Sequence, residues 1–295
     1  MTGNAPRSTT ANPLSPEGGF AVVVVAAGSG TRLGHGIPKA LVALDGRPLL
    51  EHALQGIRGA GLSGPVLVTV PAGDTALSAT ARAHGARPVT GGNTRAESVR
   101  AALAELARTA PACTAVLVHD AARCLTPPDV FRIVVERLRA GARAVVPVLP
   151  VADTMRRVDD DGRSLGTVDR TVLRAVQTPQ GFDLALLRAV NRDAARAGTD
   201  PGSVTDDASL VEAHAPDTAV ETVPGHEHAF KITRPLDLVL AEAVLRGRAP
   251  GSAAAVPVAA PATAAPAATA SATSAPSAAP MPAPSPAPTP RSTEP

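Results

Sequence analysis

Short apolar runs alternate with helix-like segments throughout the first half of the chain. The strand-like runs cover residues 20–26, 65–70, 86–92, 115–122 and 142–150. The segments between them show helical apolar spacing or helix-start signals, such as proline where a first turn would begin. Because such alternation is typical of parallel sheets, the sequence predicts an α/β fold with a doubly wound, mostly parallel sheet. Ligands bind such sheets beyond the carboxyl ends of the strands.

The first strand leads directly into a glycine-containing loop. Residues 20–26 are wholly apolar, as in a strand buried on both faces, and residues 27–32 follow as AGSGTR. Glycines let the backbone approach a ligand closely, and backbone N–H groups together with Arg32 and Lys39 suit a triphosphate. The loop has neither the spacing of a Walker A motif nor the third glycine of a dinucleotide site. The alternative is an ordinary strand-to-loop turn with surface cations.

Lysine is rare in this chain. It occurs only at Lys39 and Lys231 among 28 basic residues. A compact ammonium and a planar guanidinium behave differently, so a chain that otherwise uses arginine marks both lysines as candidates for a site. The alternative is chance survival of two surface lysines.

Residues 151–177 interrupt the alternation. They contain two extended pieces joined by a turn at Asp161-Gly162, and no helix follows to cover them. Because a lone two-stranded hairpin is marginal in water, we expect a projecting arm that packs on a second subunit. The alternative is a lid or surface hairpin on a monomer.

The rest of the chain returns to regular structure and then loses it. A helix over 183–198, a short helix beginning at 206, strands over 219–225 and 230–233, and a last helix opened by Pro235 are predicted. Residues 249–295 are almost entirely Ala, Pro, Ser and Thr, and residues 1–19 are polar and rich in Pro and Gly. We expect both ends to be disordered around a folded domain at 20–248.

Composition excludes several classes of partner. No run of 18 apolar residues is present, which excludes a helical membrane span, and the first 19 residues lack an apolar signal core. A net charge of +2 with both signs interspersed, and no Tyr or Trp, argues against a nucleic-acid partner. Cys113 and Cys124 have no metal-ligand or disulfide spacing, so we expect a reducing, cytoplasmic location.

Eight short motifs follow one another in order. They are AAGSGTRLG…PK (26–39), GGNTRAESV (91–99), VHDAAR (118–123), DT (153–154), TVDR (167–170), TPQGF (178–182), TDDAS (205–209) and KITRPLDL (231–238). Together they resemble the 2-C-methyl-D-erythritol 4-phosphate cytidylyltransferase family of the non-mevalonate isoprenoid pathway, over about residues 20–247. The resemblance implies a Rossmann-like nucleotidyltransferase fold that uses CTP, a polyol phosphate and Mg²⁺. It also implies a homodimer with interlocked hairpin arms.

The resemblance also implies roles for single residues. Arg32 and Lys39 match the pair that stabilises the transition state, and Arg170 and Lys231 match the pair that positions the polyol phosphate. Further positions that match polar residues near that substrate are Asp153, Thr154, Arg123, Thr178 and Asp206. The positions that match the nucleotide site are Ala26, Ala27, Gly28, Gly30, Gly92, Asn93, Ser98 and Ala121.

Asp120 is the carboxylate expected nearest the metal, and the alternative is an Asp that caps a loop. His119 beside it is interpreted as a packing residue at a strand end, because no proton is taken from carbon. The chain departs from the family at Cys124, where proline is usual, and at Ala229, where asparagine is frequent.

Two other functions stay open at this point. One is a cytidylyltransferase for another sugar-alcohol phosphate, such as ribitol 5-phosphate, because cations that hold one phosphate monoester serve another. The other is a non-catalytic nucleotide-binding scaffold with the proline-rich tail as its working part. The joint presence of Arg32, Lys39 and Lys231 argues against the scaffold.

Overall fold

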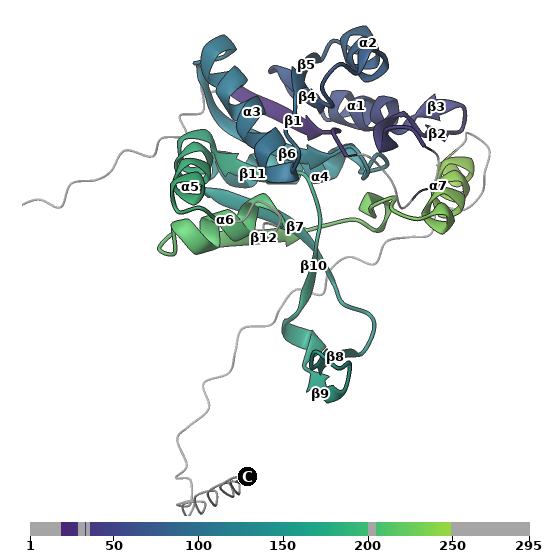
Figure 1. Ribbon diagram of the computed structural model, residues 1–295, viewed down its shortest axis with the longest axis vertical. Helices are drawn as coiled ribbons and strands as arrows, with labels where there is room; N and C mark the ends of the chain where they lie inside the picture. The colour runs from purple at the N-terminus through teal and green to yellow at the C-terminus, as the bar shows by residue number, and fades with distance from the viewer. Residues whose placement is uncertain (1–18, 29–32, 34–35, 200–204, 249–295) are drawn as a thin grey trace, which may run out of the picture. The chain divides into compact units, whose positions relative to one another are not determined.

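The computed structural model describes residues 19–28, 33, 36–199 and 205–248 (Figure 1). The predictions for residues 1–18 and 249–295 therefore lie outside the described residues. Gly19 was predicted to be disordered, and this is wrong, because it is the first residue of strand β1 (Gly19–Val25). Gly19 is the register partner of Cys113 on the neighbouring strand.

An eight-stranded sheet organises the described chain (Figure 1). Its order is β10-β7-β11-β6-β1-β4-β5, and β12 also pairs with β7. The parallel strands are β1, β4 (Val66–Val70), β5 (Arg87–Thr90), β6 (Cys113–Asp120), β7 (Ala144–Pro150) and β12 (Val220–Pro224). The antiparallel strands are β10 (Arg174–Val176) and β11 (Gln180–Asp183). The predicted α/β class with a mostly parallel sheet is confirmed.

Helices cover both faces of the sheet because both faces of its central strands are apolar. In β1, Phe20, Val22 and Val24 join one buried cluster, and Ala21 and Val23 join the other. The first cluster contains residues of α1 (Leu49–Gly59), α2 (Thr75–Ala83) and α4 (Pro128–Arg139). The second contains residues of α3 (Arg95–Thr109), α5 (Leu184–Arg196) and α6 (Asp207–His214). Alternate side chains of a strand point to opposite faces, which explains the unbroken apolar run.

The order of the strands creates a crevice. From β1 the chain builds β4 and β5 on one side, then crosses to β6 on the other side of β1. The next strand after β1 and the next strand after β6 therefore lie on opposite sides of this adjacent pair. Ligands bind at such a switch point in open α/β sheets.

The 151–177 segment is only partly as predicted. β8 (Met155–Val158) and β9 (Ser164–Val168) form a separate two-stranded sheet, and Gly162 in their connection has a φ of 79° (Figure 1). A short 3-10 helix, η3 (Arg170–Val172), follows. The segment does not stay apart from the main sheet to its end, because β10 pairs with β7, with Arg174 opposite Pro150. We call residues 151–173 the ribbon.

The segment 230–233 was predicted to be a strand, and this is wrong. It follows the 3-10 helix η4 (Glu227–Ala229) and has no regular structure. Of its backbone groups, the N–H of Ile232 donates to the carbonyl of Ala122 at 2.9 Å, which ties the segment to the end of β6 without forming a ladder. The predicted helix after it is confirmed as α7 (Pro235–Arg248).

A third apolar cluster lies beneath α7. Ala241 of α7 and Ile232 pack with Leu44 and Leu49. Leu44 belongs to a small hairpin of β2 (Ala43–Leu44) and β3 (Arg47–Pro48), and Leu49 follows that hairpin. The hairpin turns at Asp45 and Gly46, both with positive φ, as a tight two-residue hairpin turn requires. The 3-10 helix η2 (Lys39–Leu41) precedes this hairpin.

Gly181 gives a test of the sheet. A Cβ atom there would lie 2.4 Å from Val134 Cγ1 and 2.8 Å from Leu138 Cδ1 of α4, because β11 is held between β6 and β7. We expect Gly181→Ala to lower the free energy of unfolding by about 1–3 kcal/mol. The control is Gly247→Ala in α7, where nothing lies within 4 Å of the added atom. Urea unfolding of both variants measures the difference, and equal stabilities would contradict this packing.

Candidate functional site

A cavity of about 270 Å³ lies at the switch point. It is lined from the loop after β1, the β5–α3 loop, the end of β6 and the 230–233 segment. The predicted residues that line it are Ala26, Ala27, Gly28, Lys39, Gly92, Asn93, Ser98, Asp120, Ala121 and Lys231. Gly30 and Arg32 lie outside the described residues. The structure thus brings together ten of the residues that the motifs had singled out.

Backbone hydrogen bonds hold the loop after β1. The N–H of Ala26 donates to the carbonyl of Thr69 at 3.1 Å and lies 3.3 Å from its Oγ1. The N–H of Lys39 donates to the carbonyl of Gly28 at 3.3 Å. Lys39 is therefore brought back beside the end of β1, at the wall of the cavity.

The β5–α3 loop is held by the start of its own helix. Thr94 caps α3, and the Glu97 carboxylate accepts from the N–H groups of Asn93 at 2.7 Å and Thr94 at 3.2 Å. Ser98 Oγ accepts from the N–H of Gly92 at 3.2 Å and donates to the carbonyl of Thr94 at 2.9 Å. A Cβ atom at Gly92 would lie 2.3 Å from Glu97 Cβ, so only glycine fits. Ser98 therefore shapes this loop from within.

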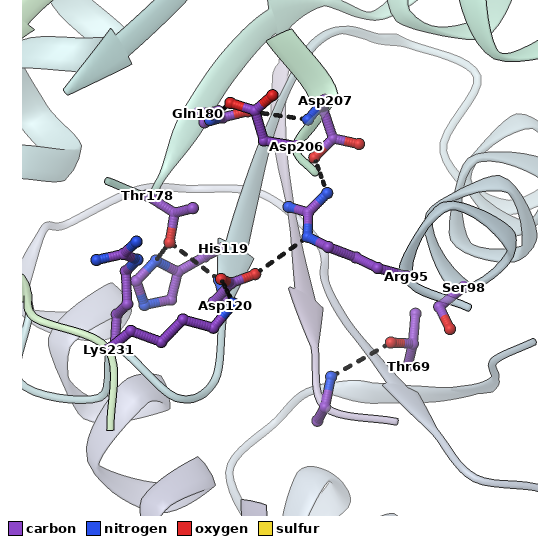
Figure 2. A network of polar contacts seen from close by, with 12 residues as sticks. Thr69, Arg95, Ser98, His119, Asp120, Thr178, Gln180, Asp206, Asp207 and Lys231 are labelled. Atoms are coloured by element: carbon purple, nitrogen blue, oxygen red, sulfur yellow. Dashed lines mark hydrogen bonds and ion pairs between the residues drawn. The ribbon is translucent and has the colours of Figure 1, made fainter. Parts of the chain in front are cut away.

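Asp120 lies between two cations at the end of β6. Its Oδ1 accepts from Arg95 Nε at 3.3 Å, and its Oδ2 lies 2.8 Å from Lys231 Nζ (Figure 2). Burial alone would raise the pKa of Asp120, but Arg95 and Lys231 outweigh it and hold that pKa well below its usual range. Asp120 is therefore a carboxylate at neutral pH.

A second carboxylate lies on the other side of Arg95. Oδ2 of Asp207, a residue only 1% exposed, lies 2.7 Å from Arg95 Nη1. The contact is an ion pair and not an aligned hydrogen bond. Among the described residues, neither the terminal nitrogens of Arg95 nor the carboxylate oxygens of Asp207 have a hydrogen-bond partner. Burial raises the pKa of Asp207, and Arg95 opposes that rise. The two carboxylates raise the pKa of Arg95 in spite of its burial.

The start of α6 holds Asp207 in place. Gln180 Oε1 accepts from the N–H of Asp207 at 3.2 Å, and Gln180 Nε2 donates to Asp206 Oδ2 at 2.7 Å (Figure 2). Asp206 caps α6, because its Oδ1 accepts from the N–H of Ser209 at 3.0 Å. Both oxygens of the Asp206 carboxylate thus have protein partners.

A second cavity, of about 450 Å³, adjoins the first. The predicted residues that line it are Arg123, Thr178, Asp206, Asp120 and Lys231. Arg95, Asp120 and Lys231 line both cavities and so form their common wall. Arg123 donates from Nη1 to the carbonyl of Ala229 at 2.8 Å and from Nη2 to that of Val176 at 3.0 Å. Arg123 therefore also joins η4 to β10.

Thr178 connects this wall to a buried histidine. Its Oγ1 accepts from the N–H of Asp120 at 3.0 Å and lies 3.0 Å from His119 Nδ1, to which it can donate its own proton. Burial lowers the pKa of His119 to about 4, so the imidazole is neutral at pH 7. His119 is fully buried against Phe131, as expected of a packing residue, and it lines neither cavity.

Three predicted residues are not brought to either cavity. Asp153, Thr154 and Arg170 are exposed on the ribbon, and the Arg170 guanidinium contacts the carbonyl of Ala152. In the other direction, sequence reasoning missed Arg95, Asp207, Gln180 and Thr69. A usable signal was the position of Arg95, because a cation at the first position of a helix opposes the helix dipole unless carboxylates lie close by.

No helix in the described part of the chain has the length and apolar character needed to cross a membrane.

Comparisons with known proteins agree with the motifs. The model of the 2-C-methyl-D-erythritol 4-phosphate cytidylyltransferase family matches residues 20–247. A protein of that name from Saccharopolyspora erythraea is 50% identical over 227 residues, which cover 76% of this chain and 97% of that protein. One from Nocardia farcinica is 48% identical, covering 81% and 99%. The crystal structure of the Thermus thermophilus protein of that name is similar, with a TM-score of 0.63 and 38% identity, covering 76% and 98%.

The buried histidine predicts a pH dependence of stability. The folded pKa of His119 is about 4 and the ordinary value is 6.5, so between these values the unfolded chain binds a proton that the folded chain does not. Stability should therefore fall as the pH falls from 6.5 towards 4, by up to about 3 kcal/mol from this group. Urea unfolding between pH 7.5 and 5 measures the slope. His119→Asn should reduce the slope, and an unchanged slope would contradict the assignment.

Proposed function

Because this chain belongs to the 2-C-methyl-D-erythritol 4-phosphate cytidylyltransferase family, it transfers the cytidylyl group of CTP to 2-C-methyl-D-erythritol 4-phosphate in isoprenoid biosynthesis, and we propose how its two cavities divide that work. The observation that carries the proposal is their common wall. Arg95, Asp120 and Lys231 face both cavities, so groups bound in the two can meet there.

CTP occupies the first cavity. The backbone of Ala27 and Gly28 and the ammonium of Lys39 suit phosphate oxygens, as anions favour backbone N–H groups and fixed cations. The Gly92–Asn93 loop supplies backbone groups for the edge of cytosine. Ser98 supports this loop, since its hydroxyl already bonds Gly92 and Thr94.

The polyol phosphate occupies the second cavity. Lys231 is its principal cation, because its side chain is 41% exposed while that of Arg123 is tied to two carbonyls. The Asp206 carboxylate and the Thr178 hydroxyl also line this cavity, where they can face the hydroxyls of the polyol.

The transfer needs position and positive charge. An oxygen of the polyol phosphate attacks the α-phosphorus of CTP, the bond from that phosphorus to the α,β-bridging oxygen breaks, and pyrophosphate leaves with the electron pair. Negative charge gathers on the α-phosphoryl oxygens, so cations fixed beforehand lower the barrier. We assign this stabilisation of charge to Lys39 and Arg32.

The residues at the wall fit a Mg²⁺ ion carried by the substrate. The described residues contain no group of three side chains able to hold a metal, and Asp120 is the one carboxylate that lines the first cavity. Mg²⁺ commonly binds through one or two carboxylates together with substrate phosphates. When bound, it would neutralise charge on the triphosphate and the departing pyrophosphate, with Asp120 as its protein ligand.

A second copy of the chain completes the site. The ribbon exposes Met155, Val158, Leu165 and Val172, and a two-stranded hairpin is marginal by itself. Arg170 lies on this ribbon and lines neither cavity of its own chain. In a two-fold dimer each ribbon can reach the other subunit's second cavity, and the exchange is reciprocal. We place this dimer in the reducing cytoplasm, where free thiols such as Cys113 persist.

Lys39→Ala tests the assignment of the first cavity. We expect turnover to fall by roughly a hundred- to thousandfold, the usual cost of removing one preorganised charge donor, with little change in melting temperature. Pyrophosphate release from CTP with 2-C-methyl-D-erythritol 4-phosphate is the measurement, and ribitol 5-phosphate is the comparison acceptor. Arg108→Ala, on the exposed end of α3, is the control. Turnover within tenfold of wild type would rule out this role for Lys39.

Subunit mixing tests the shared site. An inactive Lys39→Ala dimer is mixed with an inactive Arg170→Ala dimer under conditions that allow exchange. If sites are shared, one site of each heterodimer carries both changes and the other carries none, so each heterodimer recovers about half the wild-type activity. Native mass spectrometry verifies the exchange. If heterodimers form and stay inactive, each subunit uses its own ribbon.

A further inference from the structure

Lys231 has a counter-ion before any substrate arrives. Its Nζ lies 2.8 Å from Asp120 Oδ2, and the Asp120 side chain is only 10% exposed (Figure 2). To bind a phosphate dianion, the Lys231 ammonium must give up at least part of its contact with Asp120. Leaving a buried carboxylate without a counter-ion is costly, so substrate binding at Lys231 depends on what else holds Asp120.

Arg95 is the other cation on Asp120. Its Nε donates to Oδ1, the oxygen that Lys231 does not use, and its side chain is 18% exposed. Nη1 of the same guanidinium lies 2.7 Å from Asp207 Oδ2. Because Asp207 is held at the start of α6 by Gln180, Arg95 is fixed between two carboxylates and cannot easily follow Lys231 towards a ligand.

We propose that Arg95 is a positioning residue, the second counter-ion that lets Lys231 leave Asp120 for the phosphate of the polyol substrate. This inference rests on the proposed place of that substrate at Lys231. With Arg95 present, Asp120 keeps a cation while Lys231 turns to the phosphate. Without Arg95, and before CTP brings its metal ion, Lys231 is the one ion-pair partner left to Asp120 among the described residues, and Arg123 adds only a weaker charge interaction. The lysine is then held back.

A matched pair of variants isolates this role. Arg95→Gln alone would leave Asp207 buried and unpaired, and the protein could fail to fold. The double variant Arg95→Gln/Asp207→Asn replaces both partners of the buried pair by amides of similar size and keeps that region neutral. Asp207→Asn alone is its control, because Arg95 and its bond to Asp120 remain. The two variants differ only in the cation on Asp120.

The chain offers a direct readout, since Lys39 and Lys231 are its only lysines. Isotope-labelled lysine in the full chain gives side-chain NMR signals from these two residues, one in each proposed substrate site. Titration with 2-C-methyl-D-erythritol 4-phosphate, without CTP, follows Lys231 with no turnover. Titration with CTP follows Lys39 as the internal reference.

We expect the double variant to bind the polyol phosphate at least tenfold more weakly than Asp207→Asn, with CTP affinities within threefold of each other. In an Asp120→Asn background the same comparison should show no difference, because no carboxylate then retains Lys231. Equal polyol phosphate affinities of the two variants would overturn the role of Arg95. A tenfold loss that persists without the Asp120 charge would also overturn it, since Arg95 would then act on the substrate or the fold.

The test also separates this inference from its premise. If the Lys231 NMR signal of the wild-type protein does not change on addition of the polyol phosphate while the Lys39 signal changes with CTP, the place proposed for the second substrate is wrong. The inference is then overturned with it. If Lys231 responds in the wild type and equally in both variants, only the role of Arg95 is wrong.

Discussion

The parallel pairing of β1 with β6 is the interaction on which the site depends. Its register sets Val25 opposite Asp120, and the N–H of Ala121 continues the ladder by donating to the carbonyl of Val25 at 3.1 Å. The glycine loop therefore starts beside the carboxylate that holds Lys231. A slip of one residue would turn every side chain of the strand to the other face and remove Asp120 from the cavities. Helices packed on both faces of these strands oppose such a slip.

Charge at the common wall follows from the same geometry. The substrates of a cytidylyl transfer are both polyanions, so the site needs cations, yet buried cations are unfavourable without counter-ions. Asp120 and Asp207 are the counter-ions of Arg95, and Asp120 is also the counter-ion of Lys231. Both cations are therefore at the wall before a phosphate arrives, and Arg95 is fixed there by two carboxylates while Lys231 can turn. This matches the general requirement that electrostatic catalysis uses charges that need not reorganise during the reaction.

Periodicity was enough to predict the strands and helices that carry the core, and the motifs named most residues of the first cavity. The failures have physical causes. Residues 230–233 alternate like a strand, but their place is fixed by separate bonds from Ile232 to Ala122 and from Thr233 to Asp237, and by apolar packing. Arg95 and Asp207 were missed because charged residues at helix starts are usually solvated. Their importance comes from partners on distant segments, and the one local signal was the cation Arg95 at the first position of a helix. Ser98, predicted for the nucleotide site, lines the first cavity, and its hydroxyl also bonds its own loop.

The place where the ribbon leaves the sheet has a consequence for how such proteins diversify. Pro150 and Arg174 face each other across β7 and β10, so the two ends of the ribbon are held together by the sheet itself. The residues between them form a closed excursion, and apart from positions such as Arg170 their length and sequence can change while the cavities of their own chain keep their walls. In a family built in this way, the outer surface of the ribbon can change independently of the residues that bind nucleotide. Under the two-fold arrangement proposed above, such changes would alter which subunits pair without altering the nucleotide site.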